Sequence, residues 1–410
     1  MRILIYALNY APELTGCGKY NTELAQWLED QGHQVSVVTA PPYYPFWKVQ
    51  HPYRTGSYRR ERLQGIEVRR CPLWVPHSPT GIKRLIHLLS FALSSAPVLI
   101  AAALRWKPAL IFVVAPSLAC APAAALCGRL SGAATWLHIQ DFEVDAAFDL
   151  QIVRASLVRR SVLAVERWIM KRFDRVSTIS VSMHKKLDEK IKQPSKSRLF
   201  PNWIDTSPFM ERTRSPEMVK KFGLDASRAI ILYSGNMGAK QGIDIITSAA
   251  RLLDSQSGPQ FVLCGDGAER ARLEREAADQ KNVFFFALQP AEDFPDVLAM
   301  ADVHLLPQRA DAEDLVMPSK LLAILASARP VVATANPGSE LHSAAKNGGI
   351  VVPPGDTESF AHAITRLLAD KELATSLGEK GVRYVESQFD KHAVLARTLD
   401  EFELAVTNCE

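Results

Sequence analysis

The stretch of sequence that decides the fold is ADVHLLPQRADAEDLVMPSKLLAILASARPVVAT, residues 301–334. It begins with a short apolar run that ends at Pro307, a pattern that predicts a buried strand. After a polar loop, the apolar stripe over 321–325 predicts a helix whose first turn contains Pro318. An Arg-Pro pair ends that helix, and another apolar strand begins at Val331. This order of strand, loop, helix and strand predicts a parallel sheet of the α/β class.

Ser319 and Lys320 stand at the start of that predicted helix, on the carboxyl edge of the predicted sheet. Backbone N–H groups, a hydroxyl and an ammonium converge there, which is the chemistry of a phosphate site. The alternative is a capped helix with an exposed lysine, and this stretch alone does not choose between the two.

Similar cycles of strand, loop and helix recur along the chain. The apolar runs that predict further strands are 2–8, 35–39, 110–114, 176–180, 230–233, 261–264 and 283–286. The segment 200–205 is the predicted crossover between two such series. We therefore expect an α/β fold of two doubly wound, Rossmann-like domains that face each other across a cleft, with boundaries 1–203 and 204–387.

Two groups of residues in the first half follow predicted strands. Gly16 and Gly18 lie in the loop after the first strand, where they either let a ligand approach the backbone or serve a turn. The loop lacks the G-x-G-x-x-G pattern, so it does not indicate a dinucleotide site. His138, Asp141 and Asp145 surround the end of a later strand, where catalytic groups of such sheets lie. Each of the three could be structural alone, but the cluster favours a site.

The charge is divided unevenly along the chain. The net charge of +4 combines +13 over residues 1–200 with −9 over residues 201–410. A basic half suits an anionic lipid surface, a pyrophosphate-linked acceptor or nucleic acid, but no nucleic-acid-binding motif accompanies the charge. The six cysteines have no zinc-like spacing, so neither metal nor disulfides are expected. The N-terminus enters a strand without a signal-peptide pattern, which predicts a cytoplasmic protein.

Two helical segments of the basic half could meet a membrane. Residues 85–104 are almost continuously apolar and long enough to approach a span, although polar residues and Pro97 interrupt them. We expect a buried or membrane-surface helix rather than a span. Residues 153–175 form a basic amphipathic pattern, which suits either a solvated face or an anionic membrane surface.

Taken in order, the motifs of this chain resemble those of the family 4 glycosyltransferases with the GT-B fold, over nearly the whole chain. The motifs are L-N-Y-A-P-E-L-T-G-C-G-K-Y at 8–20, G-x-x-x-x-x-Q-G at 235–242, V-L-C-G-D-G at 262–267, A-D-V-H-L-L-P at 301–307, P-S-K at 318–320 and G-G-I-V-V-P-P-G-D at 348–356. More narrowly, the chain is similar to the exopolysaccharide glycosyltransferases of the colanic-acid type.

The resemblance implies a retaining hexosyltransferase that needs no metal or other cofactor. It would move a sugar from a GDP- or UDP-linked donor, with GDP-fucose the first candidate, to a lipid-linked acceptor of the undecaprenyl type. The enzyme would work as a peripheral protein on the inner face of the cytoplasmic membrane, and nucleic acid is not an expected partner. A C-terminal helix at about 388–410 would pack back on the first domain.

The resemblance also assigns site residues by position. Gly16 and Gly18 would let the first domain close over the sugar phosphate, and Asp141 with His138 and Asp145 would orient the sugar or the acceptor hydroxyl. The predicted donor-binding residues of the second domain are Gly235, Asn236, Lys240, Gly265, Ser319, Lys320 and Leu321. Without a metal, lysines and N–H dipoles must stabilise the departing nucleoside diphosphate.

This chain departs from the family pattern at two acidic positions. The usual Glu-x7-Glu pair falls on Leu315 and Ala323, so neither carboxylate is present to hold the nucleotide ribose. Two other functions therefore stay open beside glycosyl transfer: a sugar-nucleotide epimerase of the same fold, and a non-catalytic scaffold of a polysaccharide assembly.

Overall fold

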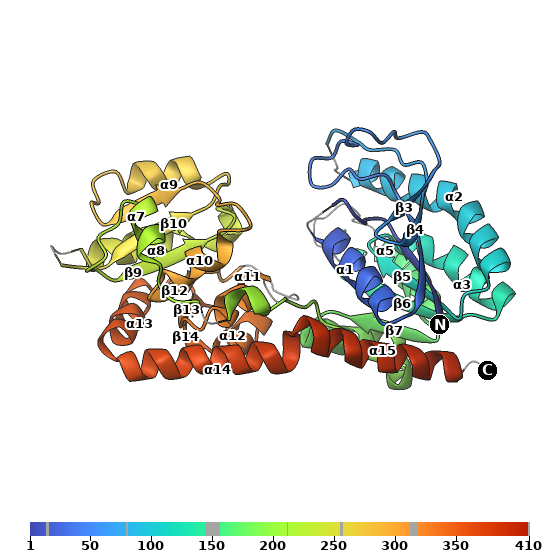
Figure 1. Ribbon diagram of the computed structural model, residues 1–410. Helices are drawn as coiled ribbons and strands as arrows, with labels where there is room; N and C mark the ends of the chain where they lie inside the picture. The colour runs from blue at the N-terminus through green and yellow to red at the C-terminus, as the bar shows by residue number, and fades with distance from the viewer. Residues whose placement is uncertain are drawn as a thin grey trace. The chain divides into compact units, whose positions relative to one another are not determined.

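The structure, a computed structural model, describes residues 1–13, 16–78, 81–143, 156–210, 212–254, 257–311 and 319–408, except for the side chains of 156–159 and 240. The chain folds into two units, each built around its own sheet (Figure 1). Unit 1 comprises Met1–Pro201 together with Leu395–Glu410, and unit 2 comprises Asn202–Val394.

Unit 1 contains an eight-stranded sheet in the order β3-β4-β2-β1-β5-β6-β7-β8. Its strands are β1 (Arg2–Ala7), β2 (Gln34–Thr39), β3 (Arg59–Leu63), β4 (Ile66–Arg70), β5 (Leu110–Ala115), β6 (Ala134–Ile139), β7 (Arg175–Thr178) and β8 (Ser197–Leu199). Neighbouring strands are parallel except for the antiparallel β3–β4 hairpin. All six residues of β5 and of β6 are buried, as expected for parallel strands covered on both faces.

The helices of unit 1 connect these strands. They are α1 (Cys17–Asp30), α2 (Gly81–Trp106), α3 (Ala121–Ser131), α5 (Ser156–Met170) and α6 (Val181–Ile191), with short 3-10 turns η1 (Leu118–Cys120) and η2 (Pro194–Lys196). Helix α2 contains the predicted apolar segment, and Pro97 lies inside it. Phe91 and Leu99 are among the residues that bury one face of α2, whereas other apolar side chains of this helix are exposed.

Unit 2 contains a six-stranded parallel sheet in the order β11-β10-β9-β12-β13-β14. Its strands are β9 (Ile230–Ser234), β10 (Gln260–Cys264), β11 (Val283–Phe286), β12 (Val303–Leu306), β13 (Val331–Thr334) and β14 (Gly349–Val352). Alternate strand residues enter two separate cores, with Leu232 in one and Tyr233 in the other. The sheet is therefore covered on both faces, which defines a doubly wound domain.

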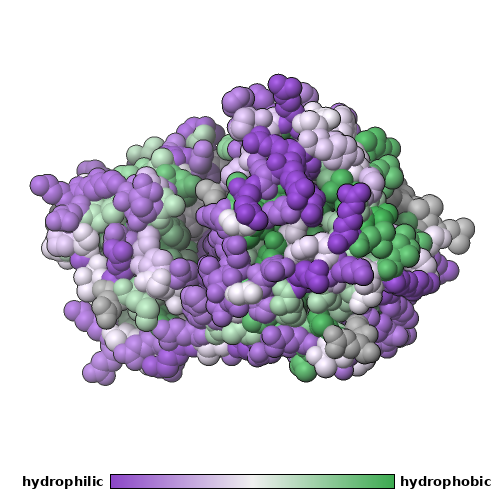
Figure 2. Space-filling view, turned by 45° about the vertical axis from the view of Figure 1, so that its right-hand side comes forward, coloured by the Kyte–Doolittle hydropathy of each residue, from purple (hydrophilic) through white to green (hydrophobic). Residues whose placement is uncertain are grey.

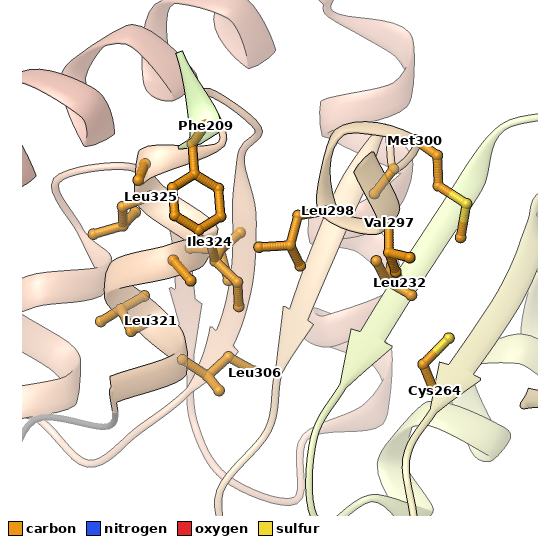
Figure 3. Packing of buried hydrophobic residues seen from close by; sticks show 14 of the residues in the cluster. Phe209, Leu232, Cys264, Val297, Leu298, Met300, Leu306, Leu321, Ile324 and Leu325 are labelled. Carbon is orange, nitrogen blue, oxygen red and sulfur yellow. The ribbon is translucent and has the colours of Figure 1, made fainter. Parts of the chain in front are cut away.

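The helices of unit 2 supply both cores. They are α7 (Pro216–Lys221), α8 (Asp244–Leu252), α9 (Arg270–Glu276), α10 (Phe294–Ala299), α11 (Ser319–Ala326), α12 (Glu340–Ala345), α13 (Thr357–Ala369) and α14 (Lys371–Phe389), with 3-10 turns η3 (Ser207–Phe209) and η4 (Ala239–Gln241). In Figure 3, Leu321, Ile324 and Leu325 of α11 point into the core that also contains Leu306 and Leu298. Helix α11 is thereby held firmly, and its first turn at Ser319 and Lys320 is held with it.

The C-terminal helix α15 (Lys391–Thr407) completes the core of unit 1. Phe402 is fully buried, and its ring centroid lies 5.3 Å from that of Phe112 and 4.9 Å from that of Trp136. Glu401 of the same helix accepts a 2.6 Å hydrogen bond from Arg198. The end of the chain therefore contributes packing to the unit that its beginning forms.

Candidate functional site

The carboxyl edge of the unit 2 sheet has the topology of a ligand site. Strand β9 lies between β10 and β12, so the order of the strands reverses direction between β9 and β12. Ligands of doubly wound sheets bind at such a switch point, outside the carboxyl ends of the strands. The loop after β9 begins with Gly235 and Asn236, the loop after β10 begins with Gly265, and α11 begins at Ser319 near this edge. The fold thus brings three of the predicted donor-binding segments to one edge.

The loops after β9 and β10 pack backbone against backbone. The Gly235 N–H donates to the Cys264 carbonyl at 2.9 Å, and the Met237 N–H donates to the Asp266 carbonyl at 2.8 Å. A Cβ atom added at Gly265 would lie only 1.9 Å from the Gly235 carbonyl oxygen. Glycine at 265 is therefore required by the close approach of the two chain segments, and it sets the shape of the edge.

Lys320 lies over the start of the β9 loop. Its ammonium nitrogen Nζ is 4.9 Å from the centroid of the Tyr233 ring and 3.4 Å from the Tyr233 hydroxyl. A Cβ atom added at Gly235 would lie 3.8 Å from the same Nζ atom. Tyr233 is itself buried, and its hydroxyl donates to the Asn236 carbonyl at 2.7 Å. A positive charge is thus positioned beside the Gly235 backbone at a helix N-terminus, which is an arrangement suited to phosphate.

The other predicted donor-binding residues differ in what the structure shows. Ser319 is exposed at the start of α11, whereas the Leu321 side chain is buried in the core, so its backbone N–H is the group at the helix start. Lys240 belongs to η4, and its side chain lies outside the described part of the structure. Ala323 is also buried in the core, and Leu315 lies outside the described residues.

A small cavity of about 330 Å³ opens beside the loop that follows β12 and the end of β13. Gln308, Arg309 and Thr334 contribute to its lining. The Gln308 N–H donates to the Thr334 hydroxyl at 2.8 Å, which ties the loop after β12 to the end of β13. The carboxyl edge of unit 2 therefore has polar groups in addition to the candidate phosphate-binding position at Lys320.

In unit 1 the loop after β1 is organised by Glu13, a residue outside the set predicted from sequence. Its Oε1 atom accepts the N–H groups of Tyr43 and Tyr44 at 2.7 and 2.8 Å, and its Oε2 accepts from Asn9 at 2.8 Å. A Cβ atom added at Gly18 would lie 2.9 Å from the Glu13 Cβ. Gly18 is therefore needed for close packing within this loop. A lone acidic residue in a loop gave no sequence signal for this role.

Gly16 is the residue that precedes α1, and its backbone is in a left-handed region with φ +57°. A Cβ atom added there would lie 3.7 Å from the Tyr44 ring, which is ordinary contact. Backbone conformation, rather than crowding, is therefore what favours glycine at this position.

His138 lies in the interior of unit 1. Its Nδ1 atom is 2.8 Å from the Ser177 hydroxyl, and its ring packs against Phe112 and Phe200 with centroid distances of 5.7 and 4.8 Å. Burial lowers the pKa of His138 to about 3, so the imidazole is neutral at physiological pH. These contacts are those of a core histidine, and we do not carry His138 into the proposed site.

The polar segment after β6 continues to the carboxyl edge of the unit 1 sheet. Asp141 is exposed there, and Asp145 lies outside the described residues. Glu143 is a member of this segment that was not among the predicted site residues. Its Oε2 atom accepts the Leu118 N–H at 2.7 Å, and burial raises its pKa to about 7. The sequence signal was its place in the acidic run, which did not distinguish it from its neighbours.

The described residues contain no group of three or more histidine, cysteine, aspartate or glutamate side chains able to share a metal ion. Among the described residues, α2 is the one helix long and apolar enough to cross a membrane by length and composition. Of its most apolar 18-residue stretch, 33% is buried inside the protein.

Comparison with solved structures defines the class of fold. Sucrose-phosphate synthase from Thermosynechococcus elongatus superposes with a TM-score of 0.73 at 19% identity, covering 99% of both chains. Anabaena Alr3699/HepE in complex with UDP-glucose superposes with a TM-score of 0.64 at 16% identity, covering 98% of this chain and 100% of the other. At such identities these likenesses show the fold alone, which is the GT-B arrangement of two Rossmann-like domains.

Comparison of sequences then identifies the family. Residues 15–203 match the glycosyl transferase 4-like domain, and residues 228–370 match the family described as glycosyl transferases group 1. WcaI of Escherichia coli (strain K12), provisionally named a colanic acid biosynthesis glycosyl transferase, is 41% identical over 98% of this chain and 99% of its own length. The chain belongs to the family 4 glycosyltransferases. The resemblance predicted from its motifs, including its narrower form, is confirmed.

Proposed function

We propose that this protein is a retaining glycosyltransferase that moves a sugar from a nucleotide-sugar donor to a lipid-linked oligosaccharide in exopolysaccharide biosynthesis of the colanic-acid type. The likeness to WcaI, at 41% identity over nearly the full chain, supports the pathway. The observation that carries the proposal is the position of the Lys320 ammonium, beside the Gly235 backbone and at the first turn of α11.

Lys320 would bind the diphosphate of the donor and stabilise it as it leaves. The negative charge that develops on the leaving nucleoside diphosphate is greatest in the transition state, so a positioned ammonium and helix N–H groups lower the barrier. This role needs no metal or other cofactor. The donor class is a GDP- or UDP-linked sugar, with GDP-fucose first, and the solved UDP-glucose complex of a protein with this fold supports a nucleotide sugar in general.

The acceptor is proposed to be lipid-linked because unit 1 carries an exposed apolar stripe on α2. Ile82, Leu85, Ile86, Leu89 and Leu93 are all more than 40% exposed, and Lys83 and Arg84 lie at the same end of the helix. An apolar face beside cations suits the surface of an anionic membrane. The protein would then act as a peripheral enzyme on the cytoplasmic face of that membrane.

The experiment that tests this function is a screen of GDP, UDP, CDP and dTDP by thermal shift and calorimetry, without metal, on wild type and Lys320→Ala. One nucleotide should stabilise the wild-type protein, because a ligand that binds the folded state raises its stability. Loss of one charge-assisted contact should weaken that binding roughly 10- to 100-fold in Lys320→Ala.

Lys346→Ala is the matched control. Lys346 is an exposed lysine of unit 2 between α12 and β14. It lies at the amino end of β14, whereas the candidate site lies at the carboxyl ends of the strands. Equal loss of affinity in both variants would point to a general charge effect rather than a diphosphate site. Binding of no nucleotide by the wild type would instead favour the scaffold. Interconversion of a nucleotide sugar without acceptor would favour the epimerase, and the anomeric configuration of a transferred sugar would test retention.

A further inference from the structure

Segments that follow three strands lie near Glu143 on the carboxyl edge of the unit 1 sheet. Glu143 itself follows β6, and its Oε2 atom accepts the N–H of Leu118, which follows β5. Cys17 begins α1 after the β1 loop, and it lies within electrostatic reach of Glu143 and Asp141. Strands β1, β5 and β6 are neighbours, and the order of the sheet reverses between β1 and β5. Glu143 is therefore at the switch point where a doubly wound domain binds its ligand.

One oxygen of the Glu143 carboxyl group is held and the other is not. The 2.7 Å bond from Leu118 holds Oε2, whereas Oε1 is buried and has no hydrogen-bond partner among the described residues. Buried polar atoms are nearly always paired, and an exception calls for a functional explanation. The hydroxyl of a bound ligand would pair with Oε1, whose direction is set by the anchored half of the same group.

The charged and titratable groups around Glu143 come from several elements. They are Arg84 at the start of α2, Asp141 on its own loop, Glu166 on α5, Cys17 on α1 and Cys120 on η1. Burial is the largest influence and raises the pKa of Glu143 to about 7, while Arg84 opposes that rise. The carboxyl group therefore exchanges its proton near neutral pH, where a general base is most effective.

We propose that Glu143 is a catalytic residue of unit 1, whose Oε1 atom accepts a hydrogen bond from the attacking hydroxyl of the acceptor and then takes its proton. The acceptor oxygen forms a bond to the anomeric carbon of the donor sugar as the bond from that carbon to the phosphate oxygen breaks. The nucleoside diphosphate leaves with the bonding electrons, and the hydroxyl proton moves to the Glu143 carboxylate. Because the proposed transfer retains the configuration of the anomeric carbon, the hydroxyl attacks on the face from which the phosphate leaves. The inference rests on the proposed glycosyl transfer.

The test is transfer of radiolabelled sugar from GDP-fucose and UDP-glucose to the lipid fraction of exopolysaccharide-producing bacterial membranes, at pH 5.5 to 9. The wild-type rate should rise with pH and level off above about pH 7, because only the ionised carboxylate takes a proton. Glu143→Gln should lower the plateau about 100-fold or more and should lose the inflection near pH 7. Glu189→Gln, which changes an exposed carboxylate on α6 of the same unit, is the control and should keep both.

Nucleoside diphosphate binding separates this inference from the function on which it rests. Glu143→Gln should still be stabilised by the nucleotide that stabilises the wild type, because Lys320 lies in the other unit. A Glu143→Gln protein that binds nucleotide and transfers sugar at the wild-type rate would overturn the role of Glu143 and leave the proposed function standing. A wild type that neither binds nucleotide nor transfers sugar would overturn both.

A second variant covers the case in which Glu143→Gln does not fold. Glu143→Asp keeps the carboxyl group but withdraws it by one methylene, so it should lower the plateau while keeping a pH inflection. An unchanged plateau in Glu143→Asp would contradict the proposal, because a proton acceptor must lie within hydrogen-bond reach of the hydroxyl.

Discussion

The His138 imidazole is neutral in the folded protein because aromatic rings and the Ser177 hydroxyl enclose it. His304 in unit 2 is similar, since it is fully buried, its Nε2 lies 3.1 Å from the Leu298 carbonyl, and its pKa is lowered to about 3. Both residues take up a proton more readily in the unfolded chain than in the fold. Their contribution to stability is therefore present above pH 6.5 and is lost as the pH falls towards 3.

We predict that His138→Gln flattens the acid side of the stability profile. At pH 5 the lowered pKa of His138 should cost the wild type about 2 kcal/mol of unfolding free energy relative to pH 7, and the variant should lack this loss. Glu143 acts in the opposite sense between pH 4.5 and 7, because its pKa is raised, so the comparison must be made between variants at each pH. Urea unfolding at pH 5, 6 and 7 measures the slope.

His362→Gln, made on an exposed histidine of α13, is the control for the loss of an imidazole. A His138→Gln protein whose stability still falls with acid as steeply as the wild type would show that the ring is hydrated in solution.

At the scale of elements, the loops after β9 and β10 form one structure. Gly235 and Gly265 belong to different strand–loop–helix cycles, but their backbones touch because β9 and β10 are neighbours in register. The Lys320 ammonium sits beside this pair, so the spacing of the two loops determines what a diphosphate would meet. The proposed donor site therefore depends on three elements together.

We predict that Gly265→Ala destabilises unit 2 and abolishes nucleotide binding. The added methyl group would overlap the Gly235 carbonyl oxygen at 1.9 Å, so the two loops must separate, at a cost on the order of 3 kcal/mol. Differential scanning calorimetry with and without nucleotide measures both effects.

Gly338→Ala is the control that separates the steric overlap of an added methyl group from the cost of placing alanine in a left-handed backbone conformation. Gly338 has φ +84° and open space where a Cβ atom would lie, so its replacement should cost about 1 kcal/mol and leave binding intact. Equal behaviour of the two variants would mean that the β9 and β10 loops can move apart freely.

At the scale of the molecule, the excess of positive charge and the exposed apolar stripe of α2 both belong to the first half of the sequence. Residues 1–200 carry +13, and the exposed leucines and isoleucines of α2 lie in that half. Leu126 and Leu130 of the neighbouring helix α3 are also about half exposed. Figure 2 shows hydrophobic side chains gathered on the side of unit 1 that α2 and α3 form. Exposed apolar surface gathered on one side of a protein is typical of interaction sites, and we therefore test this side for membrane binding.

We predict that the double variant Leu89→Asp/Leu93→Asp loses binding to anionic liposomes. The substitutions remove two apolar side chains that would insert into the membrane, and the new carboxylates are repelled by anionic headgroups. The affinity for phosphatidylglycerol vesicles, measured by sedimentation, should therefore fall at least about tenfold. The wild type should bind these vesicles better than phosphatidylcholine vesicles, and salt should reduce the difference.

The matched control is Leu252→Asp/Leu288→Asp, which changes two exposed leucines of unit 2. Undiminished sedimentation of the α2 variant, or equal loss in both variants, would argue against α2 as the membrane-binding surface.

The sequence alone was sufficient to predict the α/β class, most strands and the family. The apolar runs of β5, β9 and β12 are buried from end to end, so local hydrophobicity identifies them without knowledge of their neighbours. The position of Lys320 at a helix start was also predictable, because it is a local pattern, and its role as an anion ligand stays a prediction. These features depend on residues that are close together in the chain.

Only the tertiary structure decided which distant groups meet. Gly265 packs against Gly235, the Lys320 ammonium contacts the Tyr233 hydroxyl, and Glu143 accepts the N–H of Leu118. The two residues of each pair are far apart in the chain and meet because the strands that contain or precede them are neighbours in a sheet. The same packing encloses His138, which the sequence placed in a polar cluster, and leaves an oxygen of Glu143 without a partner among the described residues. Local sequence specifies secondary-structure propensity and the hydrophobic pattern. The burial and hydrogen bonding of a particular side chain depend instead on contacts between segments far apart in the chain.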